Sequence, residues 1–171
     1  PNGEGFPEVL LMHNVSEDHA KIAQAIAAMW KETLNVNVKI ETQEWKVYLE
    51  TLNKKTPVED VPHVFRMGWC ADYPDQNNWV HENFNTEASA NRVRRGCVDP
   101  NCETVQPTRF DELTRQGAVE QDPEKRKELY REAEKILIED ETAIAPIYHY
   151  TFITMTKPWI TVRYDSPVGG D

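Results

Sequence analysis

Residues 9–41 read VLLMHNVSEDHAKIAQAIAAMWKETLNVNVKIE, and this stretch decides the fold of the chain. Its apolar start, Val9–Met12, predicts a buried strand. Ser16 is a typical N-cap, and the apolar residues after it recur at helical spacing, so we expect a helix that ends near Leu34. Apolar and polar residues then alternate from Val36 to Glu41, as they do in a half-buried strand. A strand, a helix and a strand in this order predict a parallel βαβ unit.

The rest of the chain shows the same two patterns, apolar residues at helical spacing and apolar residues that alternate as in strands. We expect helices at Glu44–Asn53, Asp75–Asn83 and Phe110–Glu120 and from Pro123 onward behind the cap residue Asp122, and strands at His63–Cys70, Ala143–Thr154 and Trp159–Tyr164. This order is typical of the α/β class, with a mostly parallel sheet flanked by helices. We expect residues 1–171 to form a single domain.

Composition and charge narrow the functional classes. With 39% hydrophobic and 28% charged residues, the chain is globular rather than disordered. Its formal net charge of −10 repels phosphate backbones, which argues against nucleic-acid binding. No apolar run approaches the roughly 20 residues of a membrane span. Both ends read as loops and the first residue is Pro1, so we expect the chain to be cut from a longer protein.

Three cysteines leave at least one without a partner in the chain. Cys97 and Cys102 bracket a turn-rich segment that can bring them together, so we favour a local disulfide and an oxidising compartment. A zinc site is the rival interpretation, although one short pair of cysteines is weak evidence for zinc. For Cys70 alone, a free buried thiol is as good an interpretation as any other.

The sequence contains no recognisable catalytic or metal-binding motif. Cys70, His19 and Asp72 could supply the nucleophile, base and acid of a thiol hydrolase, but no local signature surrounds Cys70. His13 and His19 are six residues apart and do not share a helix face, and neither H-x-x-x-H nor C-x-x-C occurs. Because glycine-rich phosphate loops are absent as well, we expect a protein that is not an enzyme and holds no cofactor or metal.

One segment, Arg66-Met67-Gly68-Trp69-Cys70-Ala71-Asp72-Tyr73, combines a cation, an aromatic ring and an anion within a few residues. A strand is expected to end here, and ligands of open α/β sheets bind beyond the carboxyl ends of strands. A zwitterionic ligand would need such groups. The plainer interpretation is that Trp69 belongs to the core and that Asp72 caps the following turn.

With this segment the chain resembles the oligopeptide-binding proteins of ABC importers, an extracellular solute-binding family that also includes dipeptide and nickel binders. Three blocks that cover most of the chain carry the resemblance, and the second is the most specific of them. The matching residues are Asn14, His19, Trp30, Asn35–Val38 and Gln43–Trp45 within Leu11–Leu49; Gly68–Tyr73; and Arg126, Leu129, Tyr130, Ala133, Glu134, Leu137, Asp140, Ala143, Pro146 and Tyr148 within Asp122–Tyr148.

The family fold has two lobes that close on the ligand like a hinged trap. The resemblance implies that this chain is most of the second, C-terminal lobe of a type II periplasmic-binding-protein-like fold, with the first lobe and the hinge outside it. It also implies that Asp72 holds the α-amino group of a bound peptide. Trp45 and Trp69 would line side-chain pockets, and Arg66 and His19 would meet the C-terminal carboxylates of peptides of different length.

The same resemblance adds Asn14 to the ligand-binding residues. It implies that Cys70 pairs with a cysteine upstream of residue 1. The partners it implies are a peptide ligand, the missing first lobe and the membrane permease subunits of an ABC importer. The expected location is extracytoplasmic, in the periplasm or at the cell surface, with a lipid anchor on the missing N-terminus as one option.

Departures from the family pattern bear on the ligand. The position of a second carboxylate-binding arginine of the family is occupied here by Leu52, and the loop Thr56–Pro62 is longer than in the relatives that the chain resembles. The loop from Cys97 to Cys102 has no family counterpart. Relatives that bind oligosaccharides or nickel complexes leave another solute open, although the charges of Asp72 and Arg66 favour a zwitterion over a sugar.

Overall fold

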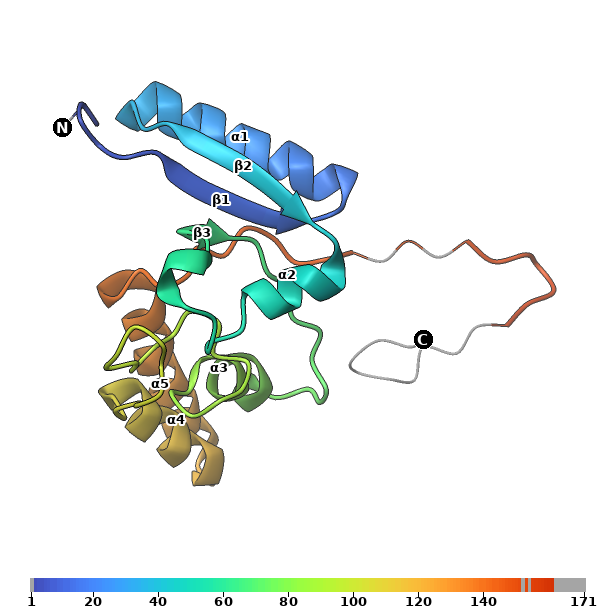
Figure 1. Ribbon diagram of the computed structural model, residues 1–171. Coiled ribbons are helices and arrows are strands. Elements are labelled where there is room, and N and C mark those ends of the chain that lie inside the picture. Colours follow the sequence, from blue (N-terminus) through green and yellow to red (C-terminus); the bar gives the residue numbers. More distant parts are fainter. Residues whose placement is uncertain (1, 152, 154, 162–171) are drawn as a thin grey trace. The chain divides into compact units, whose positions relative to one another are not determined.

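The computed structural model describes residues 2–151, 153 and 155–161 (Figure 1). Its elements, in chain order, are β1 (Val9–Asn14), α1 (Glu17–Leu34), β2 (Val38–Gln43), α2 (Trp45–Thr51), the 3-10 turn η1 (Val58–Asp60), β3 (Val64–Phe65), α3 (Gln76–Phe84), α4 (Arg109–Val119), α5 (Pro123–Lys135) and the π-helical turn η2 (Ile136–Asp140). The chain folds as two compact units, Pro1–Gly68 with Cys97–Thr104 and Trp69–Gly96 with Val105–Asp171. None of the described helices is long and apolar enough to cross a membrane.

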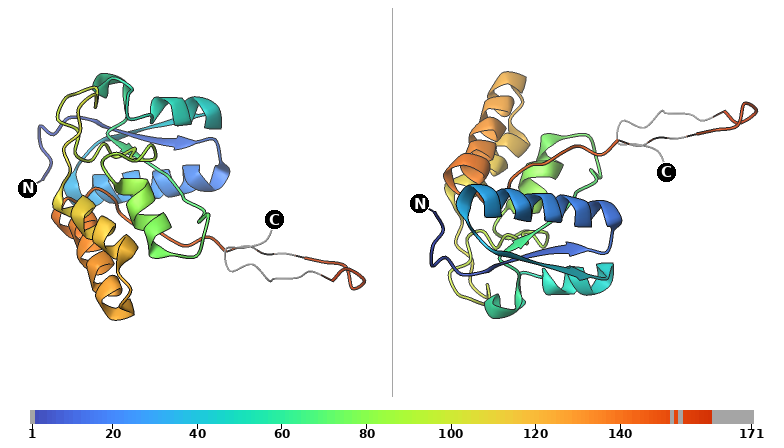
Figure 2. Two further views of the ribbon diagram at one scale, coloured as in Figure 1. Left: turned by 90° about the horizontal axis from the view of Figure 1, so that it is seen from below. Right: turned by 90° about the horizontal axis from the view of Figure 1, so that it is seen from above.

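The first unit is built on a parallel sheet in the order β2-β1-β3. β1 and β2 pair along their whole length, from Val9 opposite Val38 to Asn14 opposite Gln43. The helix between them, α1, packs along both strands (Figure 2). The predicted parallel βαβ unit is therefore confirmed.

The two faces of β1 bury different residues. Met12 packs with Tyr48 and Leu52 of α2 and its C-cap in a small buried cluster. Leu11, which is 3% exposed, points to the opposite face because side chains alternate along a strand. An apolar run buried on both faces is what a central parallel strand requires, and this explains the continuous sequence Val9–Met12.

The ends of α1 follow the signals in the sequence. The Ser16 side chain accepts a hydrogen bond from the backbone N–H of His19, and Glu17 and Asp18 place negative charge in the first turn. At the other end Asn35 takes a left-handed conformation, with φ of 53°, and its N–H closes on the carbonyl of Lys31. The helix thus stops at Leu34, as predicted.

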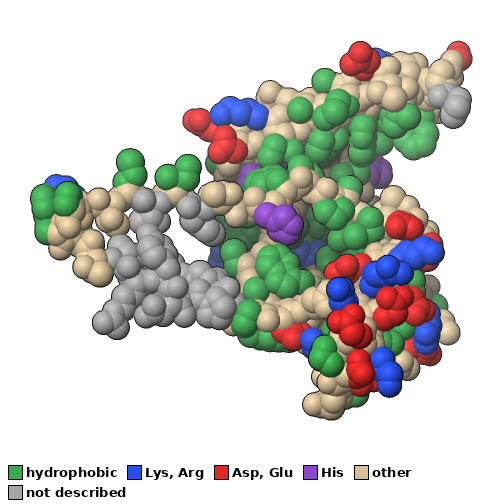
Figure 3. Space-filling view, turned by 180° about the vertical axis from the view of Figure 1, so that it is seen from behind, with side chains coloured by type: hydrophobic (Ala, Val, Ile, Leu, Met, Phe, Trp, Pro, Cys, Tyr) green, Lys and Arg blue, Asp and Glu red, His purple; other side chains and the backbone are tan. Residues whose placement is uncertain are grey.

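The second unit is helical where its structure is regular. Its core is one cluster of side chains from α3, α4, α5 and η2: Val80, Phe110, Leu113, Tyr130, Ala133 and Leu137. Asp122 caps α5 by accepting the N–H groups of Glu124 and Lys125, each at 3.0 Å. On the outer faces of α4 and α5, acidic and basic side chains are interspersed, as on an ordinary solvated surface (Figure 3).

Two predicted strands differ from the structure. His63–Cys70 was expected to be a strand, but only Val64 and Phe65 pair with β1, because the chain leaves the sheet after the Arg66 N–H has bonded to the Met12 carbonyl at 3.0 Å. No strand forms in the described part of Ala143–Thr154. Ile147 and Ile153 are 58% and 88% exposed there. A strand needs a neighbour for its backbone hydrogen bonds, and the described residues supply none.

The strand predicted at Trp159–Tyr164 lies only partly within the described residues. Residues 159–161 have no strand structure, and the remainder lies outside the described residues.

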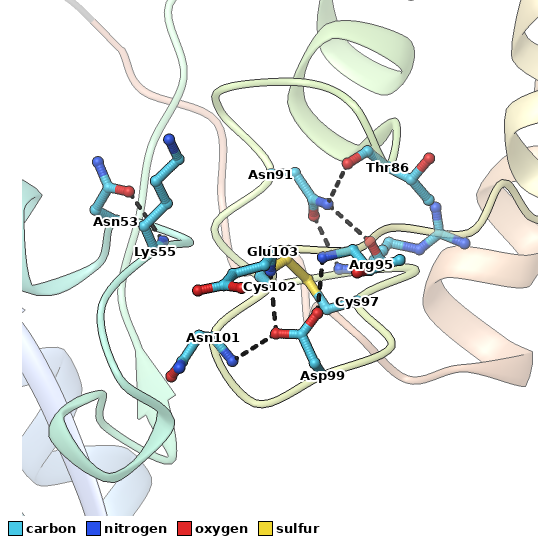
Figure 4. Close-up of a disulfide and its surroundings, with 11 residues drawn as sticks. Asn53, Lys55, Thr86, Asn91, Arg95, Cys97, Asp99, Asn101, Cys102 and Glu103 are labelled. Atoms are coloured by element: carbon cyan, nitrogen blue, oxygen red, sulfur yellow. Dashed lines mark hydrogen bonds between the residues drawn. A yellow bond between two sulfur atoms is a disulfide. The ribbon is translucent and has the colours of Figure 1, made fainter.

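Cys97 and Cys102 form a disulfide with a Cα–Cα distance of 4.8 Å, which confirms the favoured pairing over the zinc site. The Asp99 carboxylate organises the loop by accepting three backbone N–H groups, those of Asn101 and Glu103 at 3.0 Å and that of Thr104 at 2.7 Å (Figure 4). These bonds lower the pKa of Asp99. Cys70 is a free thiol and is exposed, not buried.

Candidate functional site

In the first unit, polar side chains gather at the carboxyl edge of the parallel sheet. Asn14 ends β1, Arg66 directly follows β3, and His19 lies in the first turn of α1, which begins beyond β1. The carboxyl ends of parallel strands meet at one edge of a sheet, and that is where open α/β sheets bind their ligands. The structure therefore brings together three of the predicted ligand-binding residues.

The state of His19 shows how closely these groups interact. Burial lowers the pKa of His19, and electrostatic interactions with Arg66 and His13 lower it further. A hydrogen bond with the backbone of Asn14 acts in the opposite direction without reversing the shift. The imidazole is therefore neutral at pH 7, so it can give a ligand a hydrogen bond but no full charge.

Arg66 is held at its backbone. The Tyr48 hydroxyl, on a side chain with no exposed surface, shares its proton between the carbonyl oxygens of Met12 and Arg66. This bond fixes the point at which the chain leaves β3. Tyr48 was not among the predicted site residues, because a buried aromatic residue on a helix is read as core packing.

Trp45 lies at the start of α2, two residues beyond the carboxyl end of β2. The residue is 45% exposed, and the centroid of its ring lies 6.1 Å from that of Tyr48, with an interplanar angle of 30°. An indole that rests on a buried ring and keeps an open face can form the wall of an apolar pocket.

The second unit contains the other two predicted residues, Trp69 and Asp72, and they share one partner. The Trp69 Nε1–H donates to Asn78 Oδ1 at 2.8 Å, and the Asp72 backbone N–H donates to the same oxygen at 3.0 Å. Asn78 Nδ2 donates in turn to Asp72 Oδ2 at 3.1 Å. Trp69 is thus half-buried and bonded, while the Asp72 side chain is exposed. Asp72 does not cap α3, since Asp75 does so through the N–H of Asn77.

Helix α5 anchors the segment that follows Asp72. Arg126 grips the Asp75 carboxylate with both Nη atoms, at 2.8 and 2.9 Å. These bonds lower the pKa of Asp75 against the opposing effect of burial. The Tyr130 hydroxyl donates to Asn77 Oδ1 at 2.9 Å, and burial raises the pKa of Tyr130 to about 12, so the phenol keeps its proton at neutral pH.

The predicted ligand-binding residues thus fall into two sets. Asn14, His19, Trp45 and Arg66 belong to the first unit, whereas Trp69 and Asp72 belong to the second. Within the described residues, no three His, Cys, Asp or Glu side chains are placed to hold a metal ion.

Comparison with known proteins gives the site its context. The family described as bacterial extracellular solute-binding proteins, family 5 (middle region), matches residues 1–91. The chain is 34% identical over 150 residues to the periplasmic oligopeptide-binding protein OppA of Salmonella typhimurium, a match that covers 88% of this chain and 24% of OppA. It is 35% identical over 153 residues to the periplasmic murein peptide-binding protein MppA of Escherichia coli, covering 90% of this chain and 25% of MppA.

The fold agrees with the sequence match. The unliganded open form of a periplasmic murein tripeptide-binding protein, MppA, superposes with a TM-score of 0.71 at 34% identity over 89% of this chain and 26% of that one. The chain spans about a quarter of the length of the relatives it matches. It belongs to the bacterial extracellular solute-binding proteins of family 5.

Proposed function

We propose that this chain is most of one ligand-binding lobe of an extracytoplasmic protein that binds oligopeptides and delivers them to an ABC importer. The observation that carries the proposal is the exposed Asp72 carboxylate, fixed by Asn78 next to Trp69 in the segment Gly68–Tyr73. The names of the relatives OppA and MppA point to peptides as ligands. An anion and an indole side by side suit a peptide's α-ammonium group and its first side chain.

The physical logic is that of a generalist binder. Peptide side chains vary, whereas the backbone and the two charged termini are constant. A protein that accepts many sequences must therefore bind the constant groups with charge-assisted hydrogen bonds and leave open pockets elsewhere. In the proposed complex Asp72 binds the amino terminus, Arg66 and His19 bind carboxylates, and Trp45 and Trp69 line pockets for side chains.

The proposal extends to partners and location. The complete protein would close a first lobe over the ligand and dock on the permease subunits of the importer, outside the cytoplasm. The Cys97–Cys102 disulfide suits such an oxidising compartment. In this role the chain is not an enzyme, and the charges of Asp72 and Arg66 favour a zwitterionic peptide over an oligosaccharide.

Substitution of Asp72 tests the function. In the complete protein that carries this chain, Asp72→Asn should weaken the binding of free peptides by roughly 1.5–3 kcal/mol, because the neutral amide loses a charge-assisted bond to the ammonium. N-acetylated peptides, which have no ammonium group, should lose far less. Titration calorimetry with both forms of alanine peptides of three to five residues measures the difference.

Asp18→Asn is the matched control, because the Asp18 side chain is 82% exposed in the first turn of α1. It should leave both affinities unchanged. If Asp72→Asn bound free peptides as well as the unmodified protein does, the proposed role of Asp72 would be wrong.

Peptide length gives a second test. An extended peptide advances about 3.3–3.6 Å per residue, so each added residue carries the carboxylate to a new position. We expect Arg66→Ala and His19→Ala to weaken the binding of peptides of different lengths. With Leu52 where the family has an arginine, the shortest peptides should bind least well. Equal losses at all lengths from both substitutions would contradict the assignment.

A further inference from the structure

Asn78, the third residue of α3, has no exposed surface and uses every hydrogen-bonding position of its amide. The carbonyl oxygen accepts from Trp69 Nε1 at 2.8 Å and from the Asp72 backbone N–H at 3.0 Å. The amide nitrogen donates to Asp72 Oδ2 and to Glu82 Oε2, both at 3.1 Å. One buried side chain therefore binds an indole, a backbone group and two carboxylates.

The orientation of this amide follows from its partners. Two N–H donors face one end of the Asn78 side chain and two carboxylates face the other, so a flipped amide would set donors against donors and acceptors against acceptors. No other side chain of this size supplies two donors and two acceptors. Aspartate would add a third negative charge, and alanine would leave all four partners without this bond.

The amide also forms a closed ring with Asp72. It accepts from the Asp72 backbone and donates to the Asp72 side chain, so both ends of that residue are held against one group. The bond is made by Oδ2, which leaves Oδ1 of Asp72 open to a ligand in the described structure. The same amide holds the indole of Trp69 by its nitrogen and thereby fixes the plane of the ring.

The support of Asn78 is itself fixed. The Asn83 side chain donates to the Asn78 carbonyl at 2.9 Å, and the start of the helix is tied to α5 through the Arg126 fork on Asp75. Glu82 stays in place because its second oxygen accepts from the Tyr73 hydroxyl. A partner that is buried and tied at several points can hold an exposed carboxylate in one rotamer.

We propose that Asn78 is the positioning residue of the amino-terminal subsite: it sets the rotamer of Asp72 and the plane of Trp69 so that both meet the first residue of a peptide. This inference rests on the proposed function. Asn78 does not touch the ligand; it acts through the two residues that do. Because Asp72 and Glu82 accept from the same amide, it also keeps these two negative charges at a fixed spacing.

The test is a double-mutant cycle in the complete protein that carries this chain, with alanine peptides of three to five residues and their N-acetylated forms. Asn78→Ala should weaken the binding of free peptides about tenfold or more and reduce the preference for free over acetylated peptides. In an Asp72→Asn background, Asn78→Ala should cost much less, because the carboxylate that it orients is gone.

Asn91→Ala is the matched control. Asn91 is another amide with no exposed surface in the same unit, and it bonds to the backbone of Arg95 through both ends. It should affect folding stability in a similar way but leave the preference for free peptides intact. If Asn78→Ala does not fold, Asn78→Ser retains one donor and one acceptor and should give an intermediate loss.

The outcomes separate the two proposals. If Asp72→Asn weakens the binding of free peptides but Asn78→Ala leaves the preference for free peptides intact, as Asn91→Ala should, the inference about Asn78 is overturned and the proposed function stands. If Asp72→Asn has no effect, both fail. Strong coupling in the cycle, with the preference lost in both single variants, supports both.

Discussion

The Arg126–Asp75 pair lets the support of the site be tested apart from ligand contacts. Arg126 reaches from α5 to Asp75, the N-cap of α3, and its Nε also donates to the Gly117 carbonyl at 2.9 Å. Arg126→Met keeps much of the aliphatic length of the side chain and removes all three bonds. We expect α3 to open more often in this variant, because its first turn loses the tie to α5.

The size of the effect follows from the geometry. A hydrogen bond to a charged group is worth roughly 1.5–3 kcal/mol, and bidentate pairs lie at the strong end. The two side chains are 26% and 32% exposed, so solvent screens part of the attraction. We therefore expect the free energy of local opening to fall by about 2 kcal/mol, which corresponds to a roughly 30-fold change in the opening equilibrium.

Hydrogen exchange of the α3 backbone amides, measured on the complete protein that carries this chain, reports that equilibrium. Arg131→Met on the same helix is the control, because the Arg131 side chain is 77% exposed and forms a surface pair with Glu128 at 3.3 Å. Arg126→Lys keeps the positive charge but loses the two parallel hydrogen bonds to Asp75, so its rate of hydrogen exchange in α3 should lie between those of the other two variants. Exchange in Arg126→Met within about threefold of Arg131→Met would refute the reasoning.

The sign of the pH dependence gives a second check. The pKa of Asp75 is lowered by Arg126, so the pair stabilises the folded state when the carboxylate is ionised. That contribution is present above the ordinary pKa of the carboxyl, 3.8, and is lost as the pH falls through the lowered value. The difference between the unmodified protein and Arg126→Met should therefore shrink below about pH 4.

Three further expectations concern other parts of the chain. Tyr48→Phe should lower the free energy of unfolding by about 1–2 kcal/mol in urea denaturation and also weaken the binding of peptides that depend on Arg66. The Arg66 carbonyl loses the hydroxyl that holds it, whereas the Met12 carbonyl keeps the Arg66 N–H as a donor. Peptides that meet His19 should bind more tightly in calorimetry once the pH falls below the ordinary imidazole value of 6.5, since the lowered pKa keeps the ring neutral above it, and His19→Ala should abolish this trend. When the polypeptide of residues 1–171 is alkylated without reduction, its intact mass should show one label, on Cys70. Labelling of Cys97 and Cys102 as well would contradict the disulfide.

The sequence predicted those helices well whose ends are fixed by hydrogen bonds between residues close to one another in the chain. Ser16 and Asp122 begin their helices as N-caps, and α1 ends where the pattern stops at Leu34. Such caps form bonds within a few residues, so the sequence contains all the partners. The length of β3 could not be predicted in this way. It depends on where β1 offers free backbone groups for pairing, and the apolar pattern from His63 to Cys70 does not contain that information.

The same distinction explains which parts of the candidate site could be predicted. Side chains that would touch a ligand have recognisable chemistry: Asp72 and Arg66 carry charge, and Trp69 has a large aromatic surface. Resemblance and position after a strand pointed to them. Tyr48 and Asn78 have no such signal, because one reads as core and the other as a polar residue of a short helix.

Tyr48 and Asn78 play related roles in the two units: Tyr48 holds the backbone of Arg66, and Asn78 holds the backbone and the carboxylate of Asp72. Each has no exposed surface, and each bonds to a residue that the resemblance assigns to the ligand. A charged group can stay exposed to meet a ligand and still be fixed if a buried neighbour holds it. Burial makes that neighbour reliable, because an unsatisfied polar atom inside the protein is costly and the bond is therefore kept. The polar residues most worth substituting next to an exposed ligand-binding charge are accordingly the buried ones.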